Sequence, residues 1–399
     1  MSKRFLWFLL ACFATAAELR PAPSPAEISM QKAQAQIAQH PDHYAYYNDL
    51  AMARARRARE TSDVSWYGKA EEALRQSFAI APDNFEGLKV RTWLLLGRHE
   101  FAAALESARG LNQRTPDDIT VYGYLADANA ELGNYADAVA AAQWMLNLRP
   151  GNIAGLTRAA YLRELHGDLA GAIELMQMAY DATPYQQTED RAWLLTQLSH
   201  LHLLSGDLPL AERYASGALG LFPDYHYALG ALAQVRMAQR RYEEAAGLFR
   251  RRYEAAPHAE NLYAAAEALH LAGRQAEAAE AFAEFERRSL RESGLADNSN
   301  HELIAYYVDF GGKPAEALKI ARLELARRQD VHTRDCYAWA LAASGDYAAA
   351  DAEIRKALAV GVRDPRILAH ARAIAEKLQP PNSGRRTVAA AVSGPAALR

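Results

Sequence analysis

Cysteine and unbalanced charge are both scarce in this 399-residue chain. It has two cysteines, Cys12 and Cys336, so neither a disulfide framework nor a cysteine-based zinc cage is available. Its 45 basic and 48 acidic side chains leave a net charge of −3, which lacks the basic excess that nucleic-acid binders need. Apolar residues make up 50% of the chain, which is ordinary for a globular protein. We therefore expect a folded protein that does not bind nucleic acid.

Long apolar runs are also missing, apart from a short one at the N-terminus. Lys3 and Arg4 precede an apolar stretch over residues 5–13 and small residues over 14–17, which is the pattern of a secretory signal peptide. The stretch is shorter than the ~20 residues that span a bilayer, so we expect no integral membrane span. The pattern predicts a signal peptide over residues 1–17 and an exported protein, periplasmic or secreted.

A lipoprotein signal is the alternative interpretation of the same segment. Leu9-Leu10-Ala11-Cys12 resembles a lipobox, in which Cys12 would carry a lipid anchor on a membrane-attached protein. Apolar character continues past this cysteine through Phe13, which favours ordinary cleavage near Ala17. The prolines at 21, 23 and 25 argue against the apolar stretch being the first helix of the mature domain. Residues 18–39 are then expected to form a linker or N-terminal lead-in.

A repeat of thirty-four residues runs through most of the remaining chain. Turn residues such as Gly133 and Gly167 lie midway through its units, and proline ends them. The prolines recur thirty-four positions apart at Pro82, Pro116, Pro150 and Pro184, and again at Pro223 and Pro257. This arrangement indicates two helices in each unit, the first ended by a left-handed turn and the second stopped by proline.

Small side chains mark the positions where the two helices of a unit would cross. Antiparallel helices at ~8–10 Å leave no room there for a branched side chain. In the first helices the small residues are Ala51, Ala126, Ala160, Ser199, Ala233, Ala266, Ala305 and Ala338. In the second helices they are Ala70, Ala104, Ala138, Ala172, Ala211, Ala245, Ala278, Ala317 and Ala350. Thr92 takes the small residue's place in the second unit.

The pattern resembles the tetratricopeptide repeat (TPR). The clearest unit has Leu229-x-x-Leu232-Ala233, Ala245-x-x-x-Phe249 and Pro257, and it departs from the family at Arg236, where tyrosine is common. The resemblance implies an all-α, right-handed superhelical solenoid of about nine helix-turn-helix repeats over residues 40–365. The repeats are expected to begin near Tyr44, Phe85, Ile119, Ile153, Ala192, His226, Ala259, Asn298 and Val331.

Some stretches fall outside this period. Extra residues at 61–65, 185–191 and 291–299 predict longer loops. An amphipathic segment over 366–378 predicts a capping helix, which a stacked array needs at its end. Residues 379–399 contain Pro, Gly, Ser and Ala without periodicity, so we expect a disordered tail.

The catalytic and metal-binding motifs that the sequence suggests are incomplete. His301-Glu302-Leu303-Ile304-Ala305 begins like a zinc-protease motif but lacks the second histidine, and His200 and His202 would point to different faces of a helix. Arginine runs such as 54–59 indicate solvated helix faces. Because repeats account for nearly all residues, no separate catalytic domain fits. We expect a non-enzyme without catalytic residues, metal or cofactor.

The resemblance implies a partner-binding groove lined by the first helices of successive repeats. Mapping the inward positions onto this chain gives Lys89, Trp93, Asp127, Tyr161, His200, Gln234, Tyr263, Glu267, Glu302, Tyr306, Asp335 and Trp339. Aromatic side chains give large contact area at low entropic cost. The C-terminal half of this set suits a peptide of apolar and basic character.

Two functions follow from the export signal and the array. The first is a non-enzymatic protein–protein interaction scaffold in the cell envelope, which binds a peptide segment or partner protein in the concave groove. The alternative is an accessory or regulatory subunit of an envelope enzyme or of an export or assembly complex.

Overall fold

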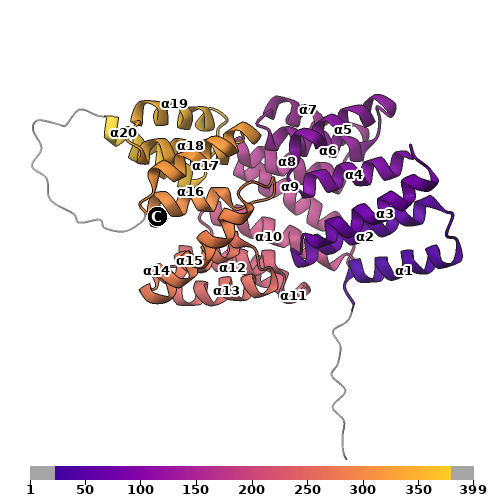
Figure 1. Ribbon diagram of the computed structural model, residues 1–399, viewed down its shortest axis with the longest axis horizontal. Coiled ribbons are helices and arrows are strands. Elements are labelled where there is room, and N and C mark those ends of the chain that lie inside the picture. The colour runs from indigo at the N-terminus through magenta and orange to yellow at the C-terminus, as the bar shows by residue number, and fades with distance from the viewer. Residues whose placement is uncertain (1–22, 379–399) are drawn as a thin grey trace, which may run out of the picture.

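Residues 23–378, which the computed structural model describes, form twenty α-helices and no strand (Figure 1). Helix α1 (Pro25–Gln39) precedes nine helix pairs, and α20 (Pro365–Leu378) follows them. The first helices of the pairs are α2 (Tyr44–Thr61), α4 (Phe85–Gly97), α6 (Ile119–Glu131), α8 (Ile153–Leu165), α10 (Thr188–Leu204), α12 (His226–Ala238), α14 (Ala259–Leu271), α16 (Asn300–Asp309) and α18 (Val331–Ala343). The second helices are α3 (Ser65–Ile80), α5 (Phe101–Arg114), α7 (Tyr135–Leu148), α9 (Leu169–Ala182), α11 (Leu208–Leu221), α13 (Tyr242–Ala255), α15 (Gln275–Glu292), α17 (Pro314–Arg327) and α19 (Tyr347–Leu358). The predicted signal peptide, lipid anchor and disordered tail lie outside the described residues.

The helix pairs follow the thirty-four-residue period. Seven of the nine first helices begin at the residue expected for them, while α10 begins at Thr188 and α16 at Asn300. Each helix packs against the next one along the chain. The predicted fold class is confirmed: the chain is an all-α, right-handed superhelical solenoid of TPR-like repeats with a capping helix.

The small residues lie buried in the packed helix pairs. Those of the second helices are at most 1% exposed. Among those of the first helices, Ala305 is the exception, since it is half-buried. Thr92 is fully buried, and its hydroxyl lies 2.9 Å from the carbonyl oxygen of Leu88 and 2.7 Å from the hydroxyl of Ser107. Hydrogen bonding of this hydroxyl lets a polar side chain occupy a position that otherwise takes alanine.

Helix α1 lies in the segment that we expected to be a linker. Pro25 stands in its first turn, where the missing N–H has no intrahelical partner to lose. The hydroxyl of Ser24 accepts a hydrogen bond from the Glu27 N–H at 3.3 Å, and the Glu27 carboxylate accepts one from the Ser24 N–H at 2.8 Å. This capping box makes proline a helix start here and not a helix breaker.

The extra residues mostly lengthen helices, where we expected loops. Helices α2, α10 and α15 have 18, 17 and 18 residues, against 13 or 14 in most of the others. Alanine and arginine over residues 53–59 favour continuation of α2, because both are good helix formers. Residues 293–299 remain a connection between α15 and α16.

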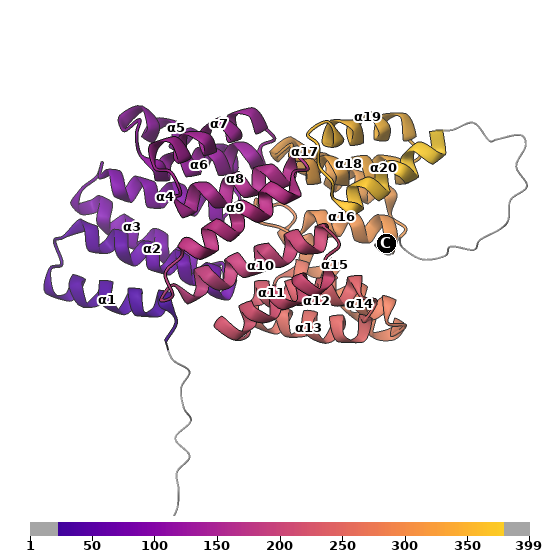
Figure 2. The same ribbon diagram turned by 180° about the vertical axis from the view of Figure 1, so that it is seen from behind.

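The superhelix closes on itself. Helices α17–α20 lie beside α6–α9 in both views of the molecule (Figures 1 and 2). One apolar cluster contains Phe101 and Leu165 from the first half of the chain together with Val331, Leu341 and Val362 from the last repeats. Repeats that are far apart in sequence therefore share a hydrophobic core.

Candidate functional site

The first closing contact joins the C-terminal end of α2 to the N-terminal ends of α10, α12 and α14. Arg59 on α2 forms an ion pair with Glu189 on α10. The backbone carbonyl of Arg59 accepts a hydrogen bond from His226 Nε2 at 2.9 Å, and that of Ser62 accepts one from His258 Nε2. Carbonyls at a helix C-terminus lack partners within the helix, so they are available as acceptors for another segment.

Burial sets the charge states at this contact. His226 is 3% exposed, and burial lowers its pKa to about 4. Its ring is therefore neutral at pH 7 and donates from Nε2 to the carbonyl. Glu189 is 6% exposed and also accepts a hydrogen bond from the Tyr225 hydroxyl at 2.5 Å. Burial and this carboxylate raise the pKa of Tyr225, which keeps the phenol protonated as the donor.

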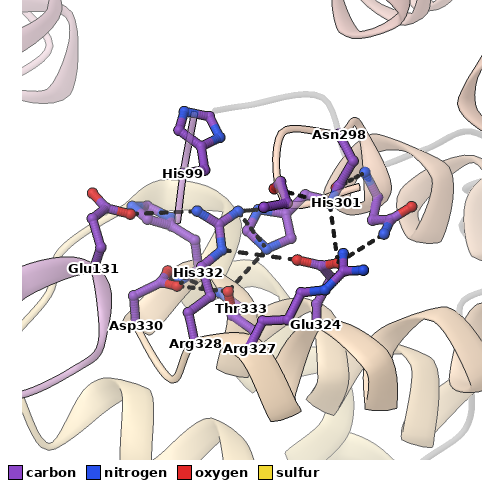
Figure 3. Close-up of polar contacts among 12 residues, drawn as sticks. His99, Glu131, Asn298, His301, Glu324, Arg327, Arg328, Asp330, His332 and Thr333 are labelled. Atoms are coloured by element: carbon purple, nitrogen blue, oxygen red, sulfur yellow. Dashed lines mark hydrogen bonds and ion pairs between the residues drawn. The ribbon is translucent and has the colours of Figure 1, made fainter. Parts of the chain in front are cut away.

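The second closing contact joins the C-terminal end of α6 and the start of α7 to the connection between α17 and α18 and the start of α18. Figure 3 shows the part of it around Arg328. The Arg328 guanidinium lies 3.3 Å from a Glu131 oxygen and 3.6 Å from an Asp330 oxygen. The Val331 backbone N–H donates to the Tyr135 hydroxyl oxygen at 2.8 Å. One arginine thus neutralises carboxylates that come from both sides of the closure.

Charge compensation around Arg328 is incomplete. Burial, with the nearby Asp330 carboxylate, raises the pKa of Glu131 to about 7 even though Arg328 opposes this shift. Burial and Arg328 lower the pKa of His301 to about 3, so that this ring is neutral where it hydrogen-bonds Thr333 at 2.9 Å. Two carboxylates therefore share one guanidinium, at 3.3 Å and 3.6 Å.

A third contact pairs His99, in the α4–α5 turn, with Asp297 in the connection before α16. The His99 Nδ1 lies 3.5 Å from an Asp297 carboxylate oxygen. His99 has a left-handed φ of 58°, where most other repeats have glycine. Burial lowers the pKa of His99, so at neutral pH it does not supply a positive charge to Asp297.

The three stretches of extra residues meet at these contacts. Residues 61–65 include Ser62, residues 185–191 include Glu189, and residues 291–299 include Asp297. A strict repeat only prescribes how each unit contacts its neighbours. The departures from the period therefore supply much of the polar surface that closes the superhelix.

Closure forms a cavity of about 520 Å³, partly open to solvent, on the inner face of the array. One wall comes from the inner helices α2, α4, α6 and α8, and the other from the N-terminal ends of α12 and α14 with Asp297 and Arg328. Tyr67, Trp93, Phe101, Tyr161 and Tyr227 are its aromatic lining residues. The volume lies in the range of ~300–1,000 Å³ that is common for ligand sites.

Three of the expected groove residues line this cavity, namely Trp93, Asp127 and Tyr161. Lys89 lies one turn before Trp93 on α4 and does not reach the lining. Its ammonium group is 2.8 Å from a carboxylate oxygen of Asp118, which joins neighbouring repeats. In the N-terminal half of the expected groove, three residues therefore line the cavity, and Lys89 forms an ion pair between repeats.

The middle of the expected groove is more open. His200 on α10 lies 2.8 Å from a carboxylate oxygen of Glu164 on α8. Burial would lower the pKa of His200, but the hydrogen bond to Glu164 outweighs it and raises that pKa. Gln234 on α12 is exposed.

Two aromatic residues of the C-terminal half pack into the core. Tyr263 is 4% exposed, and its ring centroid lies 5.3 Å from that of Phe285. Tyr306 stacks on Phe282 with ring centroids 5.1 Å apart. Both tyrosines therefore hold α14, α15 and α16 together.

The acidic and indole groups of the C-terminal half face the capping helix α20 or each other. Asp335 accepts a hydrogen bond from His370 Nδ1 at 2.9 Å, and the Trp339 ring stacks on the His370 ring at 4.2 Å. Glu267 lies 3.8 Å from the Arg366 guanidinium. Burial and the neighbouring Glu260 raise the pKa of Glu302, which is half-buried, to about 7. The binding role of all twelve expected residues stays a prediction.

The closing residues themselves were not expected from the sequence. Arg59 belongs to a run that we assigned to a solvated face, yet it is paired across the closure with Glu189 and Asp190. His226 and Arg328 carry no motif. The only signal that could have pointed to them is the position of the extra residues in the repeat.

Metal binding, membrane crossing and a free thiol are three further features of the described residues. Residues 23–378 contain no group of three or more His, Cys, Asp or Glu side chains placed to hold a metal ion. Within the same range, no helix is both long and apolar enough to cross a membrane. Cys336 is a half-buried free thiol, and burial with the nearby Asp335 raises its pKa well above the usual value.

Comparison with known proteins bears on the arrangement of the helices. No protein-family model and no curated protein matches the chain. Among solved structures, it is similar to a chain of the APC/C hetero-tetramer Cut9–Hcn1, with 12% identity and a TM-score of 0.49 over 86% of this chain and 58% of that one. This chain thus spans less than two thirds of that protein's length.

Two further solved structures illustrate the same architecture. The human IFIT1 dimer with PPP-AAAA is 13% identical, with a TM-score of 0.49 over 85% of this chain and 96% of that one. PilW, described as a widely conserved type IV pilus biogenesis factor, is 14% identical, with a TM-score of 0.44 over 51% and 92%. These likenesses concern the arrangement of the helices alone.

Proposed function

We propose that this protein is a non-enzymatic interaction scaffold that holds a segment of a partner protein against the inner face of its closed array. The observation that carries the proposal is the cavity of about 520 Å³ lined by Trp93, Asp127 and Tyr161. A concave wall with aromatic anchors and polar groups between them is the surface on which protein segments are usually bound.

The N-terminal pattern supports a place outside the cytoplasm. A basic start at Lys3 and Arg4, a short apolar stretch and small residues near Ala17 are what an export signal requires. We propose a periplasmic or secreted scaffold, with attachment through Cys12 as the alternative. N-terminal sequencing of the mature protein distinguishes them, because cleavage near Ala17 removes Cys12 and lipidation retains it.

Site-specific photo-crosslinking in the native cell tests the scaffold. A photoreactive phenylalanine analogue at position 93 faces the cavity, whereas the same analogue at position 144 replaces an outer tryptophan that is 44% exposed. We expect a discrete crosslinked partner from position 93 and no such partner from position 144. Crosslinks from position 144 alone would assign binding to the outer face and overturn the proposal.

The closing contacts favour a second candidate, an accessory subunit that responds to a catalytic or export partner by opening. Polar contacts such as those of Arg59 and Arg328 can be exchanged for contacts with another protein. Under this alternative, the crosslinked partner co-purifies in fixed stoichiometry with an enzyme or export machine. A partner segment without such an assembly supports the scaffold.

A further inference from the structure

The cavity has the chemistry of a site for a positively charged group. Five aromatic side chains line it, and carboxylates from opposite walls share the same space. Aromatic rings and carboxylates are the two protein groups that attract an organic cation, the first through the electron density of their faces. The combination accommodates a charge that is carried on an apolar stem.

The arginines of the lining are already neutralised within the protein. Arg158 lies 2.6 Å from an Asp127 oxygen, and Arg59 lies 2.6 Å from an Asp190 oxygen. Arg328 faces both Glu131 and Asp330. An incoming anion would therefore be repelled by the carboxylates that these arginines already face.

The remaining carboxylates have weak partners. Asp297 faces only the neutral imidazole of His99 at 3.5 Å among its ion-pair contacts, and Glu260 lies 3.5 Å from Arg252. Glu131 shares the Arg328 guanidinium with Asp330, at 3.3 Å and 3.6 Å. A cation in the cavity would lie close to carboxylates from both walls.

Solvent reaches these groups, so a ligand can approach them. The side chains of Asp127, Asp297 and His99, which line the cavity, are 36%, 35% and 43% exposed. A guanidinium or ammonium side chain on an extended segment can enter such a cavity while its backbone stays outside.

We infer that the cavity binds an arginine or lysine side chain of the partner segment, with its charge beside Asp297 and Glu260 and its stem among the aromatic residues around Trp93. This inference rests on the proposed function and names the chemistry of the partner.

Calorimetric titration of the full-length protein tests the inference. The probes are a short Ala–Ser peptide with two adjacent arginines, the same peptide with citrulline at both positions, and the same peptide with two glutamates. Citrulline keeps the shape of arginine and removes its charge. We expect the arginine peptide to bind about tenfold or more tightly than the citrulline peptide, because only the charged side chain forms charge-assisted hydrogen bonds with the carboxylates. Preference for the glutamate peptide, or equal binding of all three, overturns the inference.

Substitution of the lining carboxylates tests whether the arginine peptide binds in the cavity. Asp297→Asn and Glu260→Gln should each weaken the arginine peptide, while Glu106→Gln, an exposed carboxylate on α5 away from the cavity, should not. The indole N–H resonance of Trp93, identified with Trp93→Phe, should shift on titration. Binding that ignores Asp297→Asn and leaves this resonance unmoved overturns the inference. In that case, partner crosslinking from position 93 still decides the proposed function.

Titration with free arginine distinguishes a peptide ligand from a small guanidinium compound that carries the same charge. Binding of free arginine as tight as that of the peptide would assign the cavity to a small guanidinium compound and overturn a peptide partner. Tighter binding of the peptide supports it. Deletion of residues 379–399, which contain Arg385 and Arg386, provides the remaining control. If the probe binds only after this deletion, the chain's own tail is the occupant and the inference of a partner segment is wrong.

Discussion

His226 Nε2 lies 2.9 Å from the backbone carbonyl oxygen of Arg59, so the first residue of α12 is bonded to the last turn of α2 across 167 positions of sequence. Neither residue belongs to a repeat motif. The bond joins two repeats that are not neighbours in the stack, and together with the contacts of Arg328 it turns an open superhelix into a closed one.

Acid should destabilise the protein through His226. Its folded-state pKa, about 4, lies below the ordinary 6.5. Between these values the unfolded chain binds a proton that the folded chain does not, so stability is complete above pH 6.5 and falls as the pH drops towards 4. The loss approaches roughly 3 kcal/mol, since one pKa unit corresponds to about 1.4 kcal/mol. Urea unfolding at pH 7 and pH 4.5 measures it. His226→Gln keeps a donor without titrating and should lose less, and equal losses in both proteins would contradict the prediction.

Replacement of Arg328 by alanine should destabilise the closed form strongly. It leaves Glu131 and Asp330 without their shared cation, and breaking such a buried pair costs about 3–5 kcal/mol. We also expect a larger radius of gyration in small-angle X-ray scattering. The matched control is Arg114→Ala, which removes an exposed pair with Asp83 and should change little. An unchanged unfolding midpoint for the Arg328 variant would show that the contact does not hold the closure.

Two glycines offer a test of closure by steric means. Gly133 and Gly206 have nearly equal φ values of 80° and 82°. A Cβ on Gly133 would lie 2.5 Å from the carbonyl oxygen of Gln329 across the closure, whereas nothing lies within 4 Å of a Cβ on Gly206. Gly206→Ala should cost about 1–2 kcal/mol for the left-handed backbone alone. Gly133→Ala should cost more and expand the molecule in solution. Equal costs in thermal unfolding would argue against a tight contact at Gln329.

Glu302 should make the protein less stable as the pH rises. Its folded-state pKa of about 7 exceeds the ordinary 4.5, so the folded chain holds a proton that the unfolded chain has lost. Stability from this group is therefore complete below pH 4.5 and is lost as the pH rises through 7. Glu302→Gln removes the charge and should be more stable relative to wild type at pH 8 than at pH 5. Thermal unfolding at the two pH values checks this, and a pH-independent difference would exclude the effect.

Much of the fold was predictable because its causes are local. The buried alanines, the mid-repeat glycines and the prolines each act within one unit or between neighbours, and the helix starts at Phe85, Ile119 and Val331 follow from them. Local reasoning did not predict α1, which a capping box starts at Pro25 within the expected linker or lead-in. Of the extra residues, 293–299 form a loop as expected, whereas others lengthen α2, α10 and α15.

The candidate site was predictable only in part. The inward positions that the TPR resemblance implies include Trp93, Asp127 and Tyr161, which line the cavity. The opposite wall, with Asp297 and Arg328, was not inferred. Those residues reach the cavity from repeats at the other end of the array.

The sequence by itself determined paired helices, their order and their stacking, since those depend on spacing within about thirty-four residues. The closure and the cavity were decided only in the tertiary structure. The contacts that create them span 130 to 198 positions, from Arg59–Glu189 to His99–Asp297. Such contacts depend on the rotation between neighbouring repeats, added up over many repeats, and on the helices that the extra residues lengthen. No short sequence pattern predicts that total rotation.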